Sequence, residues 1–167
     1  MRSKAFFING GAGRVITSIP AFEKYAETHD DFIIVCEGGM NFYKSHPVLH
    51  KYAYDNWHKG LFEDKIKDRD CVTPEPYRRW HYYKQKCSIA QAFELEINGI
   101  DEPRDLPKPT IKLAKSEGIQ GLQLVDEAIK VTGKEKVIVV QPFGRGVHDE
   151  GGYIFDPTSR SFNLGDI

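Results

Sequence analysis

The sequence lacks long hydrophobic runs, an excess of charge of either sign, and any repeat or low-complexity segment. The longest apolar stretches, such as Val137 to Val140, are far too short to cross a bilayer, so we expect no membrane insertion. A formal net charge of -1 gives the chain no overall basic field to draw it to nucleic acid. The 167 residues, 40% of them hydrophobic, suffice for a globular domain with its own core.

Cysteine is also scarce. Cys36, Cys71 and Cys87 are odd in number and far apart, which is typical of reduced thiols rather than of a disulfide framework. The N-terminus places Arg2 and Lys4 before apolar residues, but glycines interrupt that apolar run too early for a signal peptide. We therefore expect a cytoplasmic protein.

Two short apolar segments, each followed by glycines, indicate a βαβ unit. Residues 5–8 and 31–36 have the continuous apolar pattern of buried parallel strands. Between them, Ile16, Ile19, Phe22 and Ala26 recur at helical spacing, with Pro20 inside the pattern. The sequence thus predicts an α/β fold with a Rossmann-like parallel sheet flanked by helices.

Weaker patterns predict the remaining elements. A long amphipathic helix is expected from Tyr77 to Ile97, ended by Asn98 and Gly99. Proline and charge indicate a loop over residues 101–109, and a short edge strand could form at residues 111–113. A further helix is expected to end at Gly133, before a third buried strand at residues 136–141.

The strongest local signal for a site is the glycine turn after the first strand. A strand that passes through glycines into a helix points free backbone N–H groups at one spot, where Arg14 adds a bidentate donor. The candidate phosphate-binding residues are Asn9, Gly10, Gly11, Gly13 and Arg14. No Gly-Lys-Ser/Thr follows, so this is not a P-loop, and Ile16 replaces the third glycine of the dinucleotide fingerprint. The alternative is a tight turn that only lets the helix pack on the strand.

A second candidate anion-binding set follows the strand predicted at residues 136–141. Ligands of open α/β sheets bind beyond the carboxyl ends of the strands, which is where these residues are expected. The set consists of Gly144, Arg145, Ser159, Arg160 and Ser161. A solvated surface loop is the alternative interpretation.

Two further patterns are weaker. His46 and His50 are four residues apart, but Pro47 lies between them and no third ligand is evident, so we expect no metal site. Residues 77–84 interleave cations with aromatic rings, which could stack bases or sugars. An amphipathic helix with a charged outer face explains the same run.

The stretch from Phe7 to Phe22, which contains Gly10-Gly11-Ala12-Gly13-Arg14 and Thr17-Ser18-Ile19-Pro20-Ala21, resembles the opening of the heptosyltransferase-like glycosyltransferases, glycosyltransferase family nine. Residues 45–49 are similar to a segment of that family's first half. Residues 136–144 and 156–161 are similar to the first strand and loop of its second half. The segment Gly13-Arg14-Val15 is most similar to the corresponding segment of relatives encoded by bacteriophages.

The resemblance implies the GT-B architecture, with an acceptor-side domain first and a nucleotide-sugar domain second. Residues 1–132 would be the Rossmann-like acceptor-side domain, and residues 133–167 the first strand and loop of an incomplete second one. No cofactor is implied, because the nucleotide sugar is a substrate. The missing donor-binding helices could come from a second polypeptide, and the chain alone should transfer sugar poorly.

One position departs from the family pattern. The family turn carries an aspartate, the presumed base that deprotonates the acceptor hydroxyl, where this chain has Arg14. Arginine stays protonated and cannot act as that base. By loop position, the nearest replacements are Glu37 and Asp149.

Three functions follow as hypotheses. The first is part of a nucleotide-sugar-dependent glycosyltransferase, for which nucleic acid enters only as an acceptor. The second is a non-catalytic protein that kept the half-fold and binds a nucleotide or a protein partner. The third, an unrelated Rossmann-type enzyme, is disfavoured by Ile16 at the third glycine position.

Overall fold

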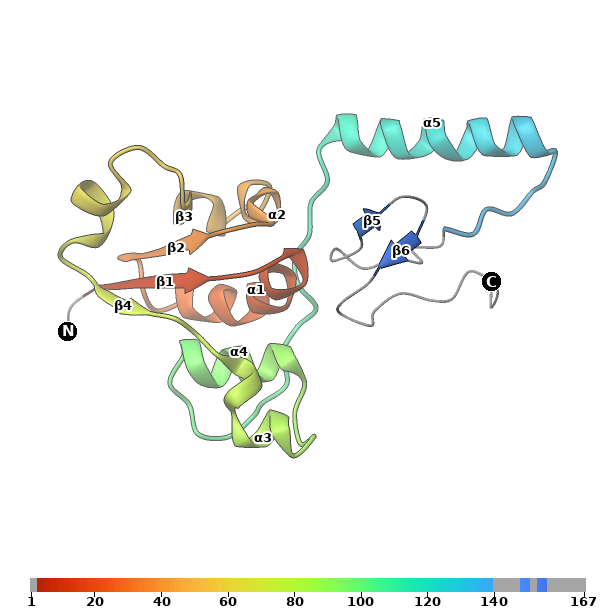
Figure 1. Ribbon diagram of the computed structural model, residues 1–167. Helices are drawn as coiled ribbons and strands as arrows, with labels where there is room; N and C mark the ends of the chain where they lie inside the picture. The colour runs from red at the N-terminus through yellow and green to blue at the C-terminus, as the bar shows by residue number, and fades with distance from the viewer. Residues whose placement is uncertain (1–2, 140–147, 151–152, 156–167) are drawn as a thin grey trace. The chain divides into compact units, whose positions relative to one another are not determined.

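The computed structural model describes residues 3–139, 148–150 and 153–155 (Figure 1). The chain divides into two compact units, with the boundary between Ala114 and Lys115. The first unit contains a four-stranded sheet, and the second contains a long helix and a two-stranded hairpin. The two units are described separately below.

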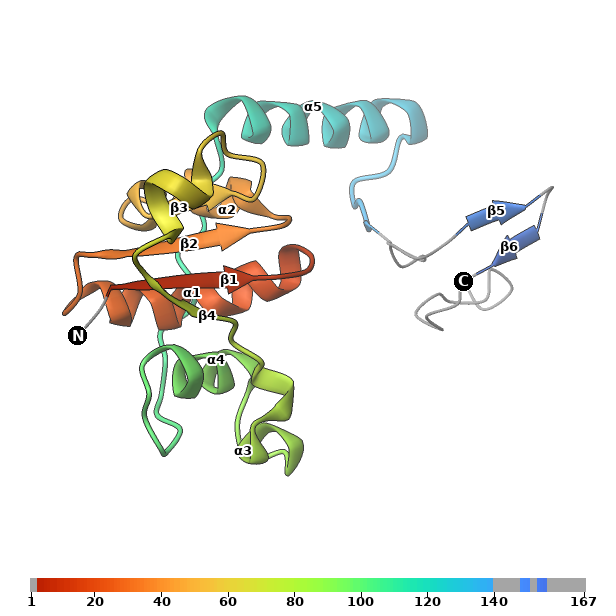
Figure 2. The same ribbon diagram turned by 60° about the vertical axis from the view of Figure 1, so that its left-hand side comes forward.

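The sheet of the first unit is entirely parallel, which confirms the predicted α/β fold class. Its strands are β1 (Lys4–Ile8), β2 (Phe32–Cys36), β3 (Ala53–Asp55) and β4 (Asp70–Val72), in the spatial order β3-β2-β1-β4 (Figure 2). β1 pairs with β2 from Lys4 opposite Phe32 to Ile8 opposite Cys36. β4 pairs with β1 only as far as Phe6 opposite Val72. The order of the strands reverses at β1, so the switch point, where such sheets bind ligands, lies between β1 and β4.

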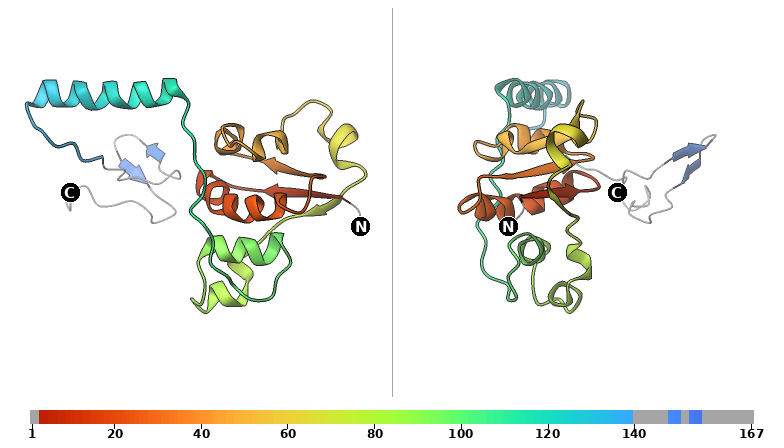
Figure 3. Two further views of the ribbon diagram at one scale, coloured as in Figure 1. Left: turned by 180° about the vertical axis from the view of Figure 1, so that it is seen from behind. Right: turned by 90° about the vertical axis from the view of Figure 1, so that its left-hand side faces the viewer.

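The core forms mainly on one face of the sheet. Helix α1 (Ala12–Ala26) lies beside α4 (Ile89–Ile97), and both cover this face (Figure 3). Phe6 meets Phe22 edge to face with ring centroids 5.3 Å apart, and Phe93 joins the same cluster. The opposite face has a smaller cluster, in which Leu61 and Ile66 cover Ile33 and Val35. Since all of β2 is buried, the absence of alternation in its sequence is explained.

Short elements link the strands. They are α2 (Met40–Lys44), the 3-10 turn η1 (Leu49–Lys51), the π turn η2 (Phe62–Ile66), the 3-10 turn η3 (Pro76–Arg78) and α3 (Trp80–Tyr83). The predicted single helix from Tyr77 to Ile97 is therefore wrong. Gln85 adopts a left-handed φ of 56° that ends α3, and Ser88 begins α4 with its own cap. The predicted end of α4 at Asn98 and Gly99 is confirmed, as is the loop over 101–109.

The second unit begins with α5 (Lys115–Thr132), which ends before Gly133 as predicted. It also contains an antiparallel hairpin of β5 (His148–Glu150) and β6 (Tyr153–Phe155). Two expected strands are corrected: residues 111–113 are not a strand, and neither are residues 136–139, where Ile138 is 85% exposed. An apolar run forms a strand only where a neighbouring strand pairs with it, and these residues have none. The last two residues of the strand expected at 136–141 lie outside the described residues. The functional division at residues 132 and 133 stays a prediction.

Candidate functional site

The carboxyl edge of the sheet brings together two residues that the sequence nominated separately. Because Ile8 lies opposite Cys36 in a parallel pair, the residues that follow each strand emerge side by side. Asn9 and Gly10 continue β1, and Glu37 continues β2. The Gly10 N–H donates to Glu37 Oε2 at 3.1 Å. Glu37 is exposed, so its carboxylate stays accessible at this edge.

Glycine is required here by close backbone packing. Gly10 has a φ of +100°, which side-chain-bearing residues rarely adopt. A Cβ on Gly38 would lie 3.2 Å from the Gly10 carbonyl oxygen, and a Cβ on Gly39 would lie 3.0 Å from Ala12 Cα. The turn after β2 therefore packs directly against the turn after β1. The structural interpretation of these glycines, a tight turn, is correct, but it does not exclude a site.

The N-terminus of α1 has none of the usual protein caps. Its N-cap is Gly11, no side chain accepts a hydrogen bond at this cap, and its first turn contains no acidic residue. The first N–H groups of a helix lack intrahelical partners and carry partial positive charge. Ala12 and Gly13, in the first turn, are both exposed. This end of α1 is open to a ligand.

Arg14 points into the molecule and not into solvent, since its side chain is only 16% exposed. Its Nη2 donates to the Pro74 carbonyl oxygen at 2.8 Å, and Nη1 lies 3.5 Å from Glu75 Oε2. The guanidinium carbon lies 5.5 Å from the Tyr77 ring centroid and 5.6 Å from that of Phe93. Arg14 thus fastens the segment after β4 to the first turn of α1.

Both carboxylates at this edge have partners within the protein. Glu37 takes the Gly10 N–H, and Glu75 faces Arg14. What the site offers a ligand is therefore carboxylate oxygen beside free helix N–H groups, a set suited to hydroxyl groups. The role of Arg14 as a phosphate ligand stays a prediction: Nη1 and Nη2 already face Glu75 and Pro74, and the buried Nε has no hydrogen-bond partner in the part of the chain that the structure describes. Sequence reasoning missed Pro74 and Glu75, which lie about sixty residues from Arg14 and carry no motif.

The second predicted set is not among the residues that the structure describes. Gly144, Arg145, Ser159, Arg160 and Ser161 lie outside the described residues. Asp149, the other candidate base, lies on β5 in the second unit. The structure brings Glu37 to the glycine turn, through its hydrogen bond from the Gly10 N–H.

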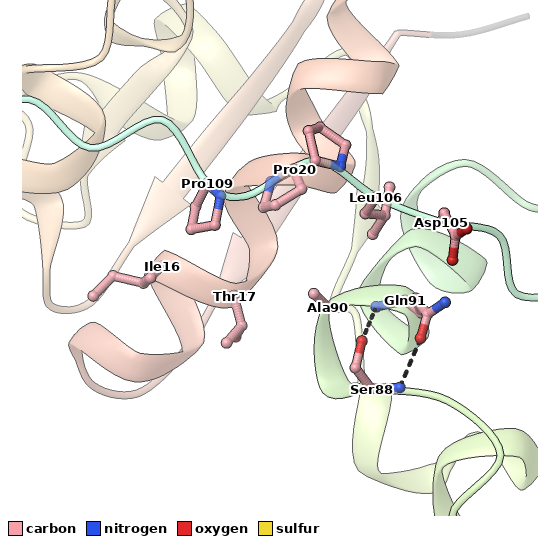
Figure 4. Close-up of a pocket in the computed structure, with 10 residues that line it drawn as sticks. Ile16, Thr17, Pro20, Ser88, Ala90, Gln91, Asp105, Leu106 and Pro109 are labelled. Atoms are coloured by element: carbon pink, nitrogen blue, oxygen red, sulfur yellow. Dashed lines mark hydrogen bonds between the residues drawn. The ribbon is translucent and has the colours of Figure 1, made fainter.

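A cavity of about 310 Å³ lies along α1, next to α4 and the proline-rich loop (Figure 4). Ile16, Thr17 and Pro20 line one side of it. On the other side, Ser88 Oγ accepts from the Gln91 N–H and Gln91 Oε1 accepts from the Ser88 N–H, and Asp105 adds a carboxylate. Because the Ser88 and Gln91 groups are engaged with each other, this cavity is a weaker candidate site.

His46 is buried and fully hydrogen-bonded. Its Nδ1 accepts from the N–H groups of Val48 and Leu49, so the proton resides on Nε2, which donates to Glu23 Oε1 at 2.8 Å. His50 Nδ1 lies 2.8 Å from the His46 carbonyl oxygen, which directs it away from any shared ligand. Among the described residues, no group of three or more metal-ligating side chains is found.

Nucleophilic cysteine chemistry is disfavoured at this edge. Cys36 directly precedes Glu37, but burial, and then the negative charge of Asp55, raise the pKa of its thiol to about 12. Since only the thiolate is a nucleophile, Cys36 is inert near neutral pH.

Comparisons with known proteins leave the candidate site without a precedent. No protein-family model matches the chain, and neither the curated proteins nor the solved structures include a significant match. Within the described part of the chain, none of the helices combines the length and apolar character that crossing a membrane requires.

Proposed function

We propose that the first unit is the acceptor-side half of a nucleotide-sugar-dependent glycosyltransferase, with Glu37 as the base. The observation that carries this proposal is the hydrogen bond from the Gly10 N–H to Glu37 Oε2. It holds an exposed carboxylate at the turn where the resembling family has its aspartate and this chain has Arg14. In this proposal Glu37, which directly follows the neighbouring strand β2, supplies the carboxylate that the sequence motif lacks.

The chemistry that follows is a single displacement. Glu37 accepts the proton of an acceptor hydroxyl as that oxygen attacks the anomeric carbon of the donor sugar. The bond from the anomeric carbon to the nucleoside diphosphate breaks, and the diphosphate leaves with the electron pair. Positioned bases of this kind contribute roughly 10²- to 10⁴-fold to a rate. The donor-binding residues are expected in a second domain or polypeptide.

An NMR titration of the full chain tests the acceptor site. Methyl glycosides of glucose, galactose and mannose should shift the amide resonances of Gly10 and Gly13. Glu37→Gln keeps a side-chain oxygen for Gly10 but loses the charge, and should weaken glycoside binding about tenfold. Glu63→Gln, a carboxylate that is 68% exposed and paired with Lys67, is the matched control and should change nothing. If no glycoside moves the Gly10 resonance, the acceptor assignment is wrong.

A second candidate function is a nucleotide-binding protein without transferase activity. It is favoured by the place of Glu37 at the end of β2, where dinucleotide-binding sheets hold a ribose hydroxyl with a carboxylate. Calorimetry with UDP-glucose and AMP separates the two candidates. The acceptor-side proposal expects weak or no binding of either compound, whereas tight binding would favour the nucleotide-binding protein.

A further inference from the structure

A separate hollow of about 470 Å³ lies in the segment between β4 and α4. Its lining consists of Tyr77, Tyr82, Tyr83, Gln85 and Cys87. The Tyr77 and Tyr82 rings are nearly perpendicular, with centroids 5.6 Å apart and an interplanar angle of 79°, so they form a corner. Tyr83 is 74% exposed, so most of its side chain is accessible to a ligand.

Gln85, in the lining, is held in an unfavourable backbone conformation. Its φ of 56° is the only positive value among the non-glycine residues of the described chain. The cause is a Schellman motif at the end of α3, in which the Gln85 N–H donates to the Tyr82 carbonyl and the Lys86 N–H to the His81 carbonyl. Glycine is the favoured residue at this position.

The same chain uses glycine where it ends other helices. Gly99 follows α4 with a φ of 64°, and Gly133 follows α5 with a φ of 63°. A left-handed glutamine therefore departs from the pattern of this protein. Residues in such conformations cluster at ligand sites. Here the glutamine is one of the residues that line a hollow made otherwise of rings and a thiol.

From these two observations we propose that the hollow is a sugar-binding subsite that takes a neutral pyranose ring. The C–H face of a pyranose carries partial positive charge and stacks on the negative face of a tyrosine. The Gln85 amide donates to one ring hydroxyl and accepts from another. No charged side chain is among the residues that line the hollow, although the Lys84 ammonium lies 5.5 Å from the centroid of the Tyr83 ring. The proposed ligand is a neutral sugar because the lining itself offers rings and an amide and no charged partner.

The subsite is linked to the glycine turn through Tyr77, which lines the hollow and contacts the Arg14 guanidinium. The inference rests on the proposed function in one respect: a sugar acceptor longer than one ring would place its second ring here. The binding itself is independent of Glu37, so the two proposals can fail separately.

The cysteines provide a direct test in the full chain. Cys87 lines the hollow, Cys71 is exposed outside it, and Cys36 is buried. Burial raises the pKa of Cys87, so alkylation by iodoacetamide is followed at mildly alkaline pH. Methyl glycosides of glucose, galactose and mannose, and maltotriose, should slow alkylation of Cys87 severalfold and leave Cys71 unchanged. Peptide mass spectrometry measures the two rates in one sample.

Two variants sharpen the test. Gln85→Gly relieves the backbone and should raise the melting temperature, while about tenfold more sugar is needed to protect Cys87. This opposite movement of stability and binding cannot come from unfolding. Tyr83→Ala should weaken protection by a similar factor. Trp57→Ala, which removes an aromatic side chain that is 85% exposed outside the hollow, should have no effect.

The outcomes decide between the proposals. The subsite is overturned if no sugar protects Cys87, if Cys71 is slowed equally, if Gln85→Gly leaves protection unchanged, or if uridine or adenosine protects better than the sugars. Protection of Cys87 without a shift of the Gly10 resonance would keep the subsite and reject the acceptor site at the turn. The reverse result would reject only the subsite.

Discussion

The two strand-to-helix connections on either side of the switch point are built in opposite ways. Three residues, 9–11, separate β1 from α1, and the helix begins without a side-chain cap. Sixteen residues, 73–88, separate β4 from α4, and that helix begins with a capping box of Ser88 and Gln91. The short connection holds the Gly10–Glu37 pair, and the long one holds the tyrosine hollow.

The difference follows from glycine and proline. Gly10 reaches a φ of +100°, so the chain reverses at once after β1. After β4 the chain meets Pro74 and Pro76, which keep the preceding residues extended and deny the turn an N–H. The second connection is therefore not helical over residues 73–75, and it passes through η3 and α3 before α4 begins. The capping box occupies N–H groups at the start of α4, whereas α1 begins without a side-chain cap.

Arg14, which joins the two connections, should give the largest effect. Arg14→Ala leaves the Pro74 carbonyl without its donor and uncovers Tyr77 and Phe93. We expect a loss of about 2–3 kcal/mol in the free energy of unfolding, measured by urea denaturation. Glu75→Gln should cost far less, because that carboxylate is 38% exposed and its pair with Arg14 is long. Equal losses in the two variants would contradict a clamp centred on Arg14.

Gly10, in the short connection, and Gly13, in the first turn of α1, should respond in opposite directions. Gly10→Ala forces a side chain into a φ of +100° and places its Cβ 3.1 Å from Arg14 Cδ, so we expect a loss of at least about 1 kcal/mol. Gly13→Ala meets no atom within 4 Å and lies inside the helix, so it should gain about 0.5 kcal/mol. Thermal unfolding followed by circular dichroism measures both variants. A loss at Gly13 would show that this glycine serves something other than the turn.

These connections also show what the sequence could predict. The βαβ unit was predictable because residues 5–8 and 31–36 are buried on both faces and glycines follow each strand. β3 and β4 were not, because Ala53–Asp55 and Asp70–Val72 are three residues long and owe their form to pairing with β2 and β1. The break in the predicted helix was hidden as well. A glutamine in the sequence does not predict a left-handed helix end. Here the hydrogen bond from the Gln85 N–H to the Tyr82 carbonyl helps to impose it.

The site was predictable only in part. Asn9 to Arg14 form the turn as expected, and Glu37 was nominated by its position after a strand. Its bond to Gly10 could not be foreseen, because it depends on the register of β1 against β2. The pairing of Arg14 with Glu75 could not be predicted either. The two residues are distant in the sequence and meet only because of the order of the strands, so no local pattern marks the pair.

The variant with the smallest expected effect on stability gives α1 a side-chain cap like that of α4, which removes the difference between the two helix starts. Gly11 has the extended backbone of an N-cap, with φ of -86° and ψ of -177°, so a serine fits there without strain. Gly11→Ser should gain only about 0.3 kcal/mol, because glycine is already a tolerable N-cap. Its hydroxyl would, however, occupy an N–H group of the first turn and compete with a ligand. We therefore expect glycoside shifts at Gly10 to weaken while the fold is slightly stabilised, measured by NMR titration and thermal unfolding of the same sample. Unchanged binding would mean that the open end of α1 takes no part in the site and that Glu37 acts there without it.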